Sequence, residues 1–327
     1  MAGMGKRMRP HTLTVPKPLI EIAGKPIVQW LVEEIAAIVK DDLEEIAFVT
    51  GHFGKEVEDK LKKIAENLGA RGSIYYQDEP LGTAHAIYCA EPALNGKIVV
   101  AFADTLFSAG FNMDEKADGI IWVKEVDDPS QFGVVKLDDN ERVTEFIEKP
   151  TQPVSKQAII GIYYFKIGET LRDEIKYLLD HKITVKGEYQ LTDALENIRK
   201  KGGVLKTGVV EEWLDCGNVK ATLEANKEVL NWLHDKEGSQ NHQFKNTVVI
   251  PPCFFGEGCE IENAVIGPYV SVGNHVHVKS SVIANSIVLS NSFIENCVLQ
   301  ESFIGEEARA EGKPVSLDIS SYSKVSL

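Results

Sequence analysis

The sequence predicts a two-part protein of the α/β class, in which a mixed, mostly parallel sheet domain precedes a short left-handed β-helix. Two observations carry this prediction. Short apolar segments alternate with amphipathic helical segments in the first part of the chain, which is the rhythm of a doubly wound sheet. From about residue 247 an apolar residue recurs at every fifth or sixth position, with glycines nearby, which is typical of a coiled repeat. We place the first domain at 1–233, a polar linker at 234–246 and the β-helix at 247–327.

The amino-acid composition limits the cellular compartment and the classes of binding partner that we expect. Of 327 residues, 43% are hydrophobic and 26% are charged, which is ordinary for a globular protein with a sizeable core. The net charge of −14 argues against general binding to nucleic acid or anionic membranes, because both need a basic face. The five cysteines include no C-x-x-C pair, which disfavours zinc sites and disulfide frameworks. We therefore expect a reduced, cytoplasmic protein without nucleic-acid or membrane partners.

The stretch with the clearest chemical character is the first eighteen residues, MAGMGKRMRPHTLTVPKP. Gly3 and Gly5 flank one residue and are followed at once by Lys6 and Arg7, while Lys17 stands between two prolines. Glycines let backbone N–H groups approach an anion, and clustered cations form charge-assisted hydrogen bonds with phosphate oxygens. An ordinary glycine-rich turn with solvated basic residues is the alternative. The fixed position of Lys17 favours a polyphosphate-binding loop.

Apolar periodicity sets the elements of the first domain. Pro26 opens an amphipathic helix that runs to about residue 40, and Gly69 ends a second helix at 54–68. From residue 119 onward the strands are joined by short polar turns, which predicts antiparallel additions to the sheet. The expected strands are 46–50, the segment ending at 77, 98–103, 120–126, 133–137 and 143–148, and the later helices begin at 188 and cover 218–234.

Polar residues at the carboxyl ends of the strands are site candidates, because ligands bind at that edge of a parallel sheet. Asp104 follows the most continuous apolar strand, where a carboxylate is well placed to hold Mg²⁺ against phosphate oxygens. An aspartate that caps the next turn is the rival interpretation. Gln77 ends the preceding strand and Gly82 precedes a helix, an arrangement too common to prove much by itself.

The C-terminal repeat predicts about three or four coils, each burying one apolar residue per face against its neighbours. A β-sandwich of short strands is the alternative, which the near-fixed period and the glycines disfavour. So short a β-helix leaves little room for an acyl-donor groove, and we expect a role in assembly or allostery instead. The predicted inward positions are Phe255, Ile261, Ile266, Val272, Val278, Ile283, Val288, Ile294, Leu299 and Ile304.

The loop motifs resemble those of a known family. The segments GMGKR, PHT and PKP are similar to the G-x-G-x-R, P-x-T and P-K-P motifs of the sugar-1-phosphate nucleotidyltransferases. Within that family the chain most resembles glucose-1-phosphate thymidylyltransferases joined to a C-terminal hexapeptide-repeat domain. The resemblance implies a Rossmann-like catalytic domain that joins a nucleoside triphosphate to a sugar 1-phosphate and releases pyrophosphate.

Two departures from the family pattern are visible. The usual loop reads G-G-x-G-x-R, one residue longer, and the shorter form is more similar to bacterial UTP-using relatives, so dTTP and UTP both stay open. The family also begins with an apolar strand that leads into the loop. Because a parallel sheet without its central strand would leave buried backbone groups unpaired, we expect a short strand to precede Met1, which would be an internal methionine.

The resemblance also implies catalytic roles for four residues. A sugar 1-phosphate oxygen would attack the α-phosphate in line, with Arg7 holding the departing phosphates and Lys17 stabilising the charge that builds at the α-phosphate. Asp104 and Asp215, the latter in a W-x-D-x-G match, would hold Mg²⁺. The attacking phosphate oxygen is already ionised, so we expect no general base and no catalytic histidine.

Binding residues follow from further matches to the family. Gln77 would read a pyrimidine edge, because an amide offers both donors and an acceptor. Glu148 would accept sugar hydroxyls, Lys149 would pair with the sugar phosphate, and Gly161 would let the sugar lie close to the backbone. The implied nucleotide-binding set is Ala2, Gly3, Met4, Gly5, Lys6, Gln77, Pro80, Gly82 and Thr83, and the sugar-phosphate set is Gly133, Glu148, Lys149, Ile159 and Gly161.

The expected partners are therefore dTTP or UTP, a sugar 1-phosphate with glucose 1-phosphate as the first expectation, Mg²⁺ and further copies in a homo-oligomer. A nicotinamide-binding oxidoreductase is disfavoured, because Met8 stands where G-x-G-x-x-G needs its third glycine. Two alternatives stay open. One is a catalytically inactive regulatory or scaffold relative, and the other is a bifunctional enzyme whose β-helix, with His275 and His277, transfers an acyl group.

Overall fold

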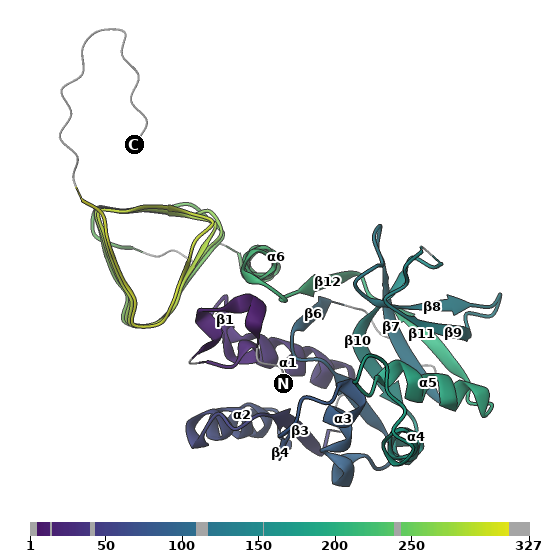
Figure 1. Ribbon diagram of the computed structural model, residues 1–327. Helices are drawn as coiled ribbons and strands as arrows, with labels where there is room; N and C mark the ends of the chain where they lie inside the picture. The colour runs from purple at the N-terminus through teal and green to yellow at the C-terminus, as the bar shows by residue number, and fades with distance from the viewer. Residues whose placement is uncertain are drawn as a thin grey trace. The chain divides into compact units, whose positions relative to one another are not determined.

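Figure 1 shows the computed structural model of the chain. The structure describes residues 5–13, 15–39, 43–108, 117–152, 154–238 and 243–313. By its internal contacts the chain divides into two compact units. The first comprises Met1–Ile20 and Lys25–Ala221, and the second comprises Glu21–Gly24 and Thr222–Leu327. A short turn near the N-terminus is therefore part of the unit that holds the C-terminal repeat.

The first unit alternates strands and helices, as the sequence predicted for an α/β domain. Its helices are α1 (Ile27–Val39), α2 (Lys55–Asn67), α3 (Thr83–Tyr88), α4 (Gly168–Asp180) and α5 (Leu191–Lys200), with 3₁₀ turns η1 (Lys6–Met8), η2 (His11–Leu13), η3 (Lys17–Leu19) and η5 (Glu91–Ala93). Its strands are β2 (Lys25–Pro26), β3 (Glu45–Thr50), β4 (Arg71–Tyr76), β5 (Ile98–Ala101), β6 (Thr105–Ser108), β7 (Gly119–Glu125), β8 (Gly133–Leu137), β9 (Val143–Glu148), β10 (Gln157–Phe165), β11 (Leu205–Val209) and β12 (Glu212–Asp215).

A six-stranded mixed sheet forms the centre of this unit, with the order β11-β7-β10-β8-β9 and with β5 paired to β10. β10 lies in the middle, and eight of its nine residues are buried. It pairs antiparallel with β5, β7 and β8, whereas β11 joins β7 in parallel. The antiparallel additions predicted from residue 119 onward are therefore confirmed. β3 and β4 form a separate parallel pair, and β6 and β12 an antiparallel one.

One apolar core joins this sheet to the helices on its face. Figure 1 shows α3, α4 and α5 grouped on one side of the strands. Leu171 and Ile175 of α4 and Leu195 of α5 pack in one cluster with Ile121 and Val123 of β7, and all five are buried. Hydrophobic burial on this face therefore holds the helices against the sheet.

The second unit contains the predicted β-helix. Three parallel sheets of four strands each stack their strands coil upon coil, in the orders β13-β16-β19-β22, β14-β17-β20-β23 and β15-β18-β21-β24. Their triangular cross-section is visible in Figure 1. The strands are β13 (Val248–Val249), β14 (Cys253–Phe255), β15 (Glu260–Glu262), β16 (Val265–Ile266), β17 (Val270–Val272), β18 (His277–Lys279), β19 (Val282–Ala284), β20 (Ser286–Val288), β21 (Phe293–Glu295), β22 (Val298–Gln300), β23 (Phe303–Ile304) and β24 (Arg309–Glu311).

The hexad pattern locates the interior of this β-helix correctly. Seven of the ten predicted inward residues are buried in its core cluster, where Ile266, Val272, Ile283 and Ile294 are completely buried. The other three, Phe255, Leu299 and Ile304, are partly buried and pack against that cluster. The corners need backbone in the left-handed region, which Asn263, Asn285 and other residues adopt. Asparagine tolerates that conformation better than most residues, so the polar corner positions follow from the geometry of the turn.

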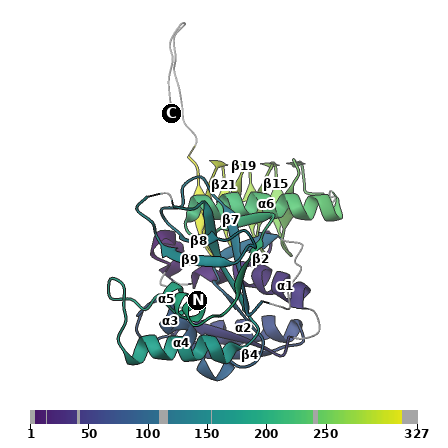
Figure 2. The same ribbon diagram turned by 90° about the vertical axis from the view of Figure 1, so that its right-hand side faces the viewer.

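Strand β1 (Glu21–Ile22) and helix α6 (Val219–Glu237) from Thr222 onward complete the second unit. Figure 2 shows α6 running across the strands of the β-helix. Because α6 extends to Glu237, the first residues of the segment predicted as a linker are helical. The proposed domain boundaries at 233 and 247 stay a prediction.

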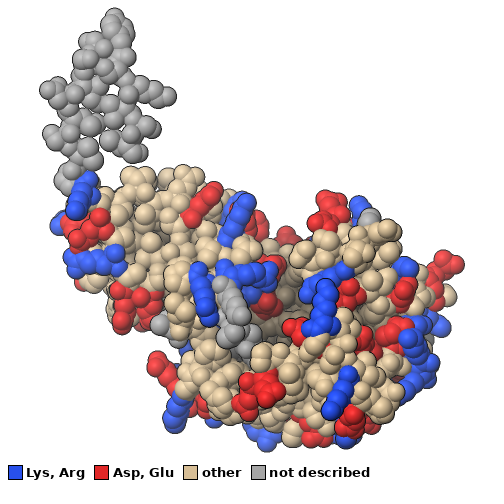
Figure 3. All heavy atoms as spheres, in the orientation of Figure 1, with Lys and Arg blue, Asp and Glu red and all other residues tan. Residues whose placement is uncertain are grey.

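The described surface carries both signs of charge. On the face drawn in Figure 3, basic and acidic side chains are interspersed, and neither sign forms a continuous field. Within the described ranges, no helix is both long enough and apolar enough to cross a bilayer.

Replacing Ile283 by alanine tests the packing of the β-helix. Ile283 is completely buried, whereas its neighbour Val282 in β19 is 41% exposed. We expect Ile283→Ala to cost about 2–4 kcal/mol, because it removes buried methyl groups and leaves a cavity. It should lower the urea midpoint measured by far-UV circular dichroism. Val282→Ala, the matched control, should change that midpoint little, and equal shifts for the two variants would contradict the assigned interior.

Candidate active site

The N-terminal loop is shaped around Gly5. Its φ is +53°, a conformation that favours glycine, and its carbonyl accepts hydrogen bonds from the Met8 N–H at 2.8 Å and the Thr12 hydroxyl at 2.8 Å. Met8 is completely buried and anchors the loop, whereas Arg7 is exposed. The buried Met8 side chain therefore anchors the loop, while the guanidinium group of Arg7 faces solvent. Ala2, Gly3, Met4 and the side chain of Lys6, which belong to the predicted nucleotide-binding set, lie outside the described residues.

Lys17 is the most constrained cation of the site. It begins η3, whose turn closes with a hydrogen bond from the Leu19 N–H to the Pro16 carbonyl at 2.8 Å. Its side chain is only 8% exposed, and its Nζ donates to Asp104 Oδ2 at 2.8 Å. A buried ammonium group is costly unless it is paired, so Asp104 is the partner that makes this position of Lys17 possible.

The β6–β12 pair brings Asp104 and Asp215 together. β6 begins directly after Asp104, and its register pairs Thr105 with Asp215. The Cys216 N–H then donates to the Asp104 carbonyl at 3.0 Å. Two carboxylates that are far apart in the sequence thus stand side by side at the end of one ladder, and sequence analysis had selected both.

The electrostatics of the two carboxylates favour a cation. Burial raises the pKa of Asp215, and the negative charge of Asp104 raises it further, whereas the charges of Lys17 and Arg7 act in the opposite direction. All four residues predicted to surround the triphosphate therefore lie within electrostatic reach of one point. That these four residues form one catalytic site, and the role of each in it, stays a prediction.

This pair of carboxylates suits Mg²⁺. Asp104 is 43% exposed, so it offers oxygen lone pairs in addition to the one that Lys17 occupies. Mg²⁺ at phosphate-binding sites of proteins is usually bound by one or two carboxylates, with phosphate oxygens and water completing the octahedron. No cluster of three or more metal-binding side chains is present among the residues that the structure describes. Asp104 and Asp215 would thus supply part of the shell and a bound triphosphate the rest.

The predicted base-reading residues form a second group. Gln77 follows β4, its N–H donates to the Thr50 carbonyl at 2.9 Å, and its Nε2 donates to the Gly82 carbonyl at 3.2 Å. The same Nε2 lies 3.0 Å from Nδ1 of His85, which accepts when the ring is neutral with its proton on Nε2. His85 therefore orients the Gln77 amide. Sequence analysis assigned no catalytic role to His85 and did not connect it with Gln77, although it lies in the first turn of the helix that Gly82 precedes.

Gly82 and Thr83 are held by a distant loop. Gly82 has φ +110°, and a Cβ there would lie 2.5 Å from the Tyr189 carbonyl oxygen. The Ala84 N–H donates to that carbonyl at 3.0 Å, and Thr83 Oγ1 accepts from the Leu191 N–H at 3.0 Å. Gly82 is thus required for close backbone contact as well as for its left-handed φ. Pro80, also in the predicted set, lies exposed beside this turn.

The predicted sugar-phosphate residues meet at the β8–β9 pair. Gly133 and Glu148 are direct cross-strand neighbours. A Cβ at Gly133 would lie 3.0 Å from Glu148 Oε2 and 3.3 Å from Ile159 Cδ1. The missing side chain therefore makes room for the Glu148 carboxylate over the sheet. Thr192 of α5 also borders this space, and its Oγ1 is buried without a hydrogen-bond partner in the described part of the chain.

Glu148 and Lys149, at the end of β9, have opposite charges. Burial raises the pKa of Glu148, and the negative charges of Asp193 and Glu188 raise it further. Lys149 opposes them, with its Nζ 3.7 Å from Glu148 Oε1, while its own side chain is 61% exposed. Hydrogen-bond donors such as sugar hydroxyls would therefore stabilise the Glu148 carboxylate. Lys149 is a largely exposed cation beside it.

Gly161 connects the sugar region to the aspartates. It interrupts the register of β10 with β7, has φ +83°, and accepts a hydrogen bond from the Phe102 N–H at 2.9 Å. A Cβ at Gly161 would lie 2.9 Å from the Phe102 ring. Thr105, next to Asp104, donates its hydroxyl to the neighbouring Ile160 carbonyl at 3.2 Å. The bulge therefore fixes the segment that carries Asp104 against β10.

The two histidines of the β-helix have structural contacts. His277 Nδ1 lies 3.1 Å from Glu260 Oε2 on one neighbouring strand, and its ring lies beside that of Phe293 on the other, with the ring centroids 6.4 Å apart. His275 occupies a corner with φ +54°, where its ring fills the space beside Gly258. His277 is therefore a cross-strand residue and His275 a corner residue of the β-helix.

The two aspartates should respond oppositely to neutralisation. The pKa of Asp215 is raised in the folded protein, so its ionisation costs stability at neutral pH, and that cost disappears as the pH falls and the group takes up its proton. We expect Asp215→Asn to raise the thermal midpoint in EDTA at pH 7, with the difference between variant and wild type narrowing as the pH falls towards the ordinary pKa of an aspartate. Asp104→Asn should lower the midpoint, because it leaves the buried Lys17 without its anion. A loss of stability in both variants would contradict the charge balance described above.

Comparison with known proteins gives a consistent result. Residues 1–231 match the nucleotidyl transferase family. A glucose-1-phosphate thymidylyltransferase of Streptomyces antibioticus is 30% identical over 303 residues, 85% of this chain and 83% of that protein. The low-salt glycan biosynthesis nucleotidyltransferase Agl11 of Haloferax volcanii is 33% identical over 237 residues, 70% of this chain but only 64% of that protein. The bifunctional protein GlmU of Methanocaldococcus jannaschii is 31% identical over 354 residues, 98% of this chain and 82% of that protein.

A solved structure shares the fold. UDP-glucose pyrophosphorylase in complex with UDP-glucose superposes with a TM-score of 0.58 at 26% identity, over 71% of this chain and 96% of that one. The resemblance to sugar-1-phosphate nucleotidyltransferases that the N-terminal motifs indicated is thus confirmed. Because the family match covers well over half of its residues, the chain belongs to the nucleotidyl transferase family.

Proposed function

We propose that the chain joins a pyrimidine nucleoside triphosphate, dTTP or UTP, to glucose 1-phosphate, with pyrophosphate as the second product. The arrangement of Lys17 and Arg7 around the adjacent Asp104 and Asp215 carries this proposal. Cations and carboxylates at one point suit a polyphosphate that arrives with a divalent ion. The Streptomyces antibioticus relative and the UDP-glucose pyrophosphorylase structure support a pyrimidine nucleotide and a glucose unit.

The chemistry needs positioning and charge stabilisation more than a covalent partner. In-line transfer moves the α-phosphorus from the bridging oxygen of pyrophosphate to an oxygen of the sugar 1-phosphate. Mg²⁺ held by Asp104 and Asp215 would neutralise phosphate oxygens. The Lys17 side chain is only 8% exposed, and an ammonium group shielded from water stabilises developing charge more strongly than one in water. Arg7 on the exposed part of the loop would hold the departing phosphates.

The sugar side supplies the nucleophile and its orientation. Lys149 extends into solvent and would pair with the phosphate of the incoming sugar. Glu148, whose raised pKa reflects burial among other carboxylates, would accept hydrogen bonds from ring hydroxyls. Gly133 makes room for the Glu148 carboxylate that would receive these hydroxyls. No proton has to be removed, because the attacking phosphate oxygen is already ionised at neutral pH.

The nucleotide side would read the base through one amide. Gln77 is held by Gly82 and His85 through its Nε2, which leaves its carbonyl oxygen as an acceptor for the N–H of a pyrimidine imide. Uracil and thymine present the same edge and differ only by a methyl group, which is worth about 1–3 kcal/mol in a fitted pocket. We therefore keep both nucleotides in the proposal. The mannose-1-phosphate guanylyltransferase of Drosophila melanogaster, 30% identical over 329 residues, makes GTP and mannose 1-phosphate the natural competitors to test.

A substrate grid tests the function directly. Pyrophosphate release is measured for dTTP, UTP, GTP, ATP and CTP against the 1-phosphates of glucose, mannose and N-acetylglucosamine, with Mg²⁺ present. We expect the highest kcat/KM for glucose 1-phosphate with dTTP or UTP. A preference for GTP with mannose 1-phosphate would replace the substrate assignment. No release from any pair would identify the chain as a binding or regulatory relative.

Lys17→Ala tests the proposed centre of the reaction. We expect kcat to fall by about 100–1000-fold, because a preorganised cation at the reacting phosphate is lost. Lys136→Ala is the matched control, since Lys136 pairs with Glu145 on the surface and should leave kcat unchanged. Similar activities for wild type and Lys17→Ala would remove Lys17 from the catalytic centre.

A further inference from the structure

We propose that Asn226 and Ser271 are positioning residues for Lys17, because together they hold the turn Glu21–Gly24 that follows η3. This inference rests on the proposed function, in which Lys17 acts on the α-phosphate. Neither residue belongs to the first unit, and neither is part of the site described above. The β-helix unit would thus contribute to catalysis by fixing a turn of the N-terminal segment.

The turn leaves the first unit and returns to it within a few residues. A hydrogen bond from the Ile27 N–H to the Ile20 carbonyl, at 3.0 Å, closes its base. Between these two residues, Glu21–Gly24 belongs to the second unit, and Ile22 and Ala23 are buried there. Ala23 has φ +45°, in the left-handed region that alanine rarely adopts. Such a backbone persists only where its surroundings enforce it.

Two side chains enforce it by binding the Ala23 N–H. That group donates to Asn226 Oδ1 at 3.1 Å and to Ser271 Oγ at 3.2 Å. The Ser271 hydroxyl in turn donates to Asn226 Oδ1 at 2.6 Å, so the three groups form a closed set with defined directions. Asn226 is completely buried and Ser271 is 4% exposed, which shields these hydrogen bonds from water.

The choice of an asparagine is not explained by packing. Within the described residues, Asn226 Nδ2 is buried without a hydrogen-bond partner, which is costly for a polar group. A leucine of similar size would fill the space without that cost. The contribution that only the amide can make is its oxygen, which holds the turn.

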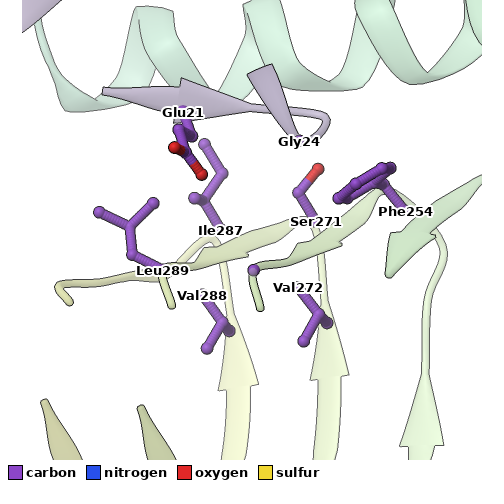
Figure 4. Close-up of a pocket in the computed structure, with 9 residues that line it drawn as sticks. Glu21, Gly24, Phe254, Ser271, Val272, Ile287, Val288 and Leu289 are labelled. Atoms are coloured by element: carbon purple, nitrogen blue, oxygen red, sulfur yellow. The ribbon is translucent and has the colours of Figure 1, made fainter. Parts of the chain in front are cut away.

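A close contact between Gly24 and the Phe254 ring also fixes the turn. Gly24 has φ +80°, and a Cβ there would lie 2.0 Å from Cζ of Phe254. Figure 4 shows the Phe254 ring beside Gly24 and the Ser271 hydroxyl pointing at the turn, whereas Val272 and Val288 point the other way. Glu21, Ile287 and Leu289 line the small hollow that remains between the turn and the sheet β14-β17-β20-β23. The turn is therefore fixed by hydrogen bonds at Ala23 and by shape at Gly24.

Fixing the turn restricts Lys17 through the short chain between them. η3 ends at Leu19, and Leu19 and Ile20 are themselves buried, so little slack remains before Glu21. Lys17 must keep its Nζ beside Asp104 and within reach of a phosphate. A misplacement of about 1 Å at such a group costs up to about 100-fold in rate. A looser turn should accordingly lower kcat while the charge of Lys17 is retained.

The test compares Ser271→Ala and Asn226→Leu with Ser281→Ala. Ser281 is a matched control, because it is 2% exposed in the same β-helix and its hydroxyl donates to the Lys279 carbonyl, away from the turn. With dTTP or UTP and glucose 1-phosphate, we expect kcat to fall about tenfold in the first two variants, with KM for the triphosphate within twofold of wild type. The double variant should be no worse than the poorer single variant, because both act on one N–H. Ser281→Ala should keep the wild-type kcat.

Hydrogen–deuterium exchange gives a readout that does not depend on activity. The amides of 17–23 should exchange faster in Ser271→Ala and Asn226→Leu than in wild type, and at the wild-type rate in Ser281→Ala. Unchanged exchange, or faster exchange with an unchanged kcat, would overturn the positioning role. An inactive wild type would instead show that the proposed function is wrong, and the role of the turn in catalysis would fall with it.

Discussion

The ion pair between Lys17 and Asp104 is the constraint on which the site depends. An ammonium group at 8% exposure is stable only beside an anion, so the buried position of Lys17 and the place of Asp104 determine each other. η3 fixes one partner, and the end of β5 with the β6–β12 ladder fixes the other. The pair thereby joins an N-terminal turn to the central part of the first unit, over a sequence separation of 87 residues.

The second aspartate converts this pair into a site for a charged ligand. Burial raises the pKa of Asp215, and the negative charge of the neighbouring Asp104 raises it further, so ionised Asp215 carries an electrostatic cost. Unfavourable like charges that persist in a protein commonly mark a functional site, because the ligand that relieves them gains binding energy. Here the relief would come from a divalent ion, and the exposed Arg7 and buried Lys17 would balance the phosphates that accompany it.

Glycines shape the space around these charges through several distinct constraints. Gly5 and Gly82 have a left-handed φ, and Gly82 is also pressed against the Tyr189 backbone. Gly133 makes room for the Glu148 carboxylate, and Gly161 forms a bulge that holds the Asp104 segment against β10. Each of these glycines therefore stands where a side chain would clash with a neighbour or strain the backbone.

Local patterns in the sequence were sufficient to predict the helices and strands and to select the charged residues of the candidate site. The hexad spacing gave the interior of the β-helix, and strand-end position with motif resemblance selected Lys17, Asp104 and Asp215, because periodicity and motifs are properties of neighbouring residues. His85 beside Gln77, the Tyr189 backbone against Gly82, and the hold of Asn226 and Ser271 on Ala23 emerged only from the tertiary structure. Ala23 and Asn226 are 203 residues apart, and no local propensity encodes such a contact. It forms only when hydrophobic burial has brought the two segments together, so the sequence by itself determined which chemistry the chain carries, and the folded structure decided which residues hold that chemistry in place.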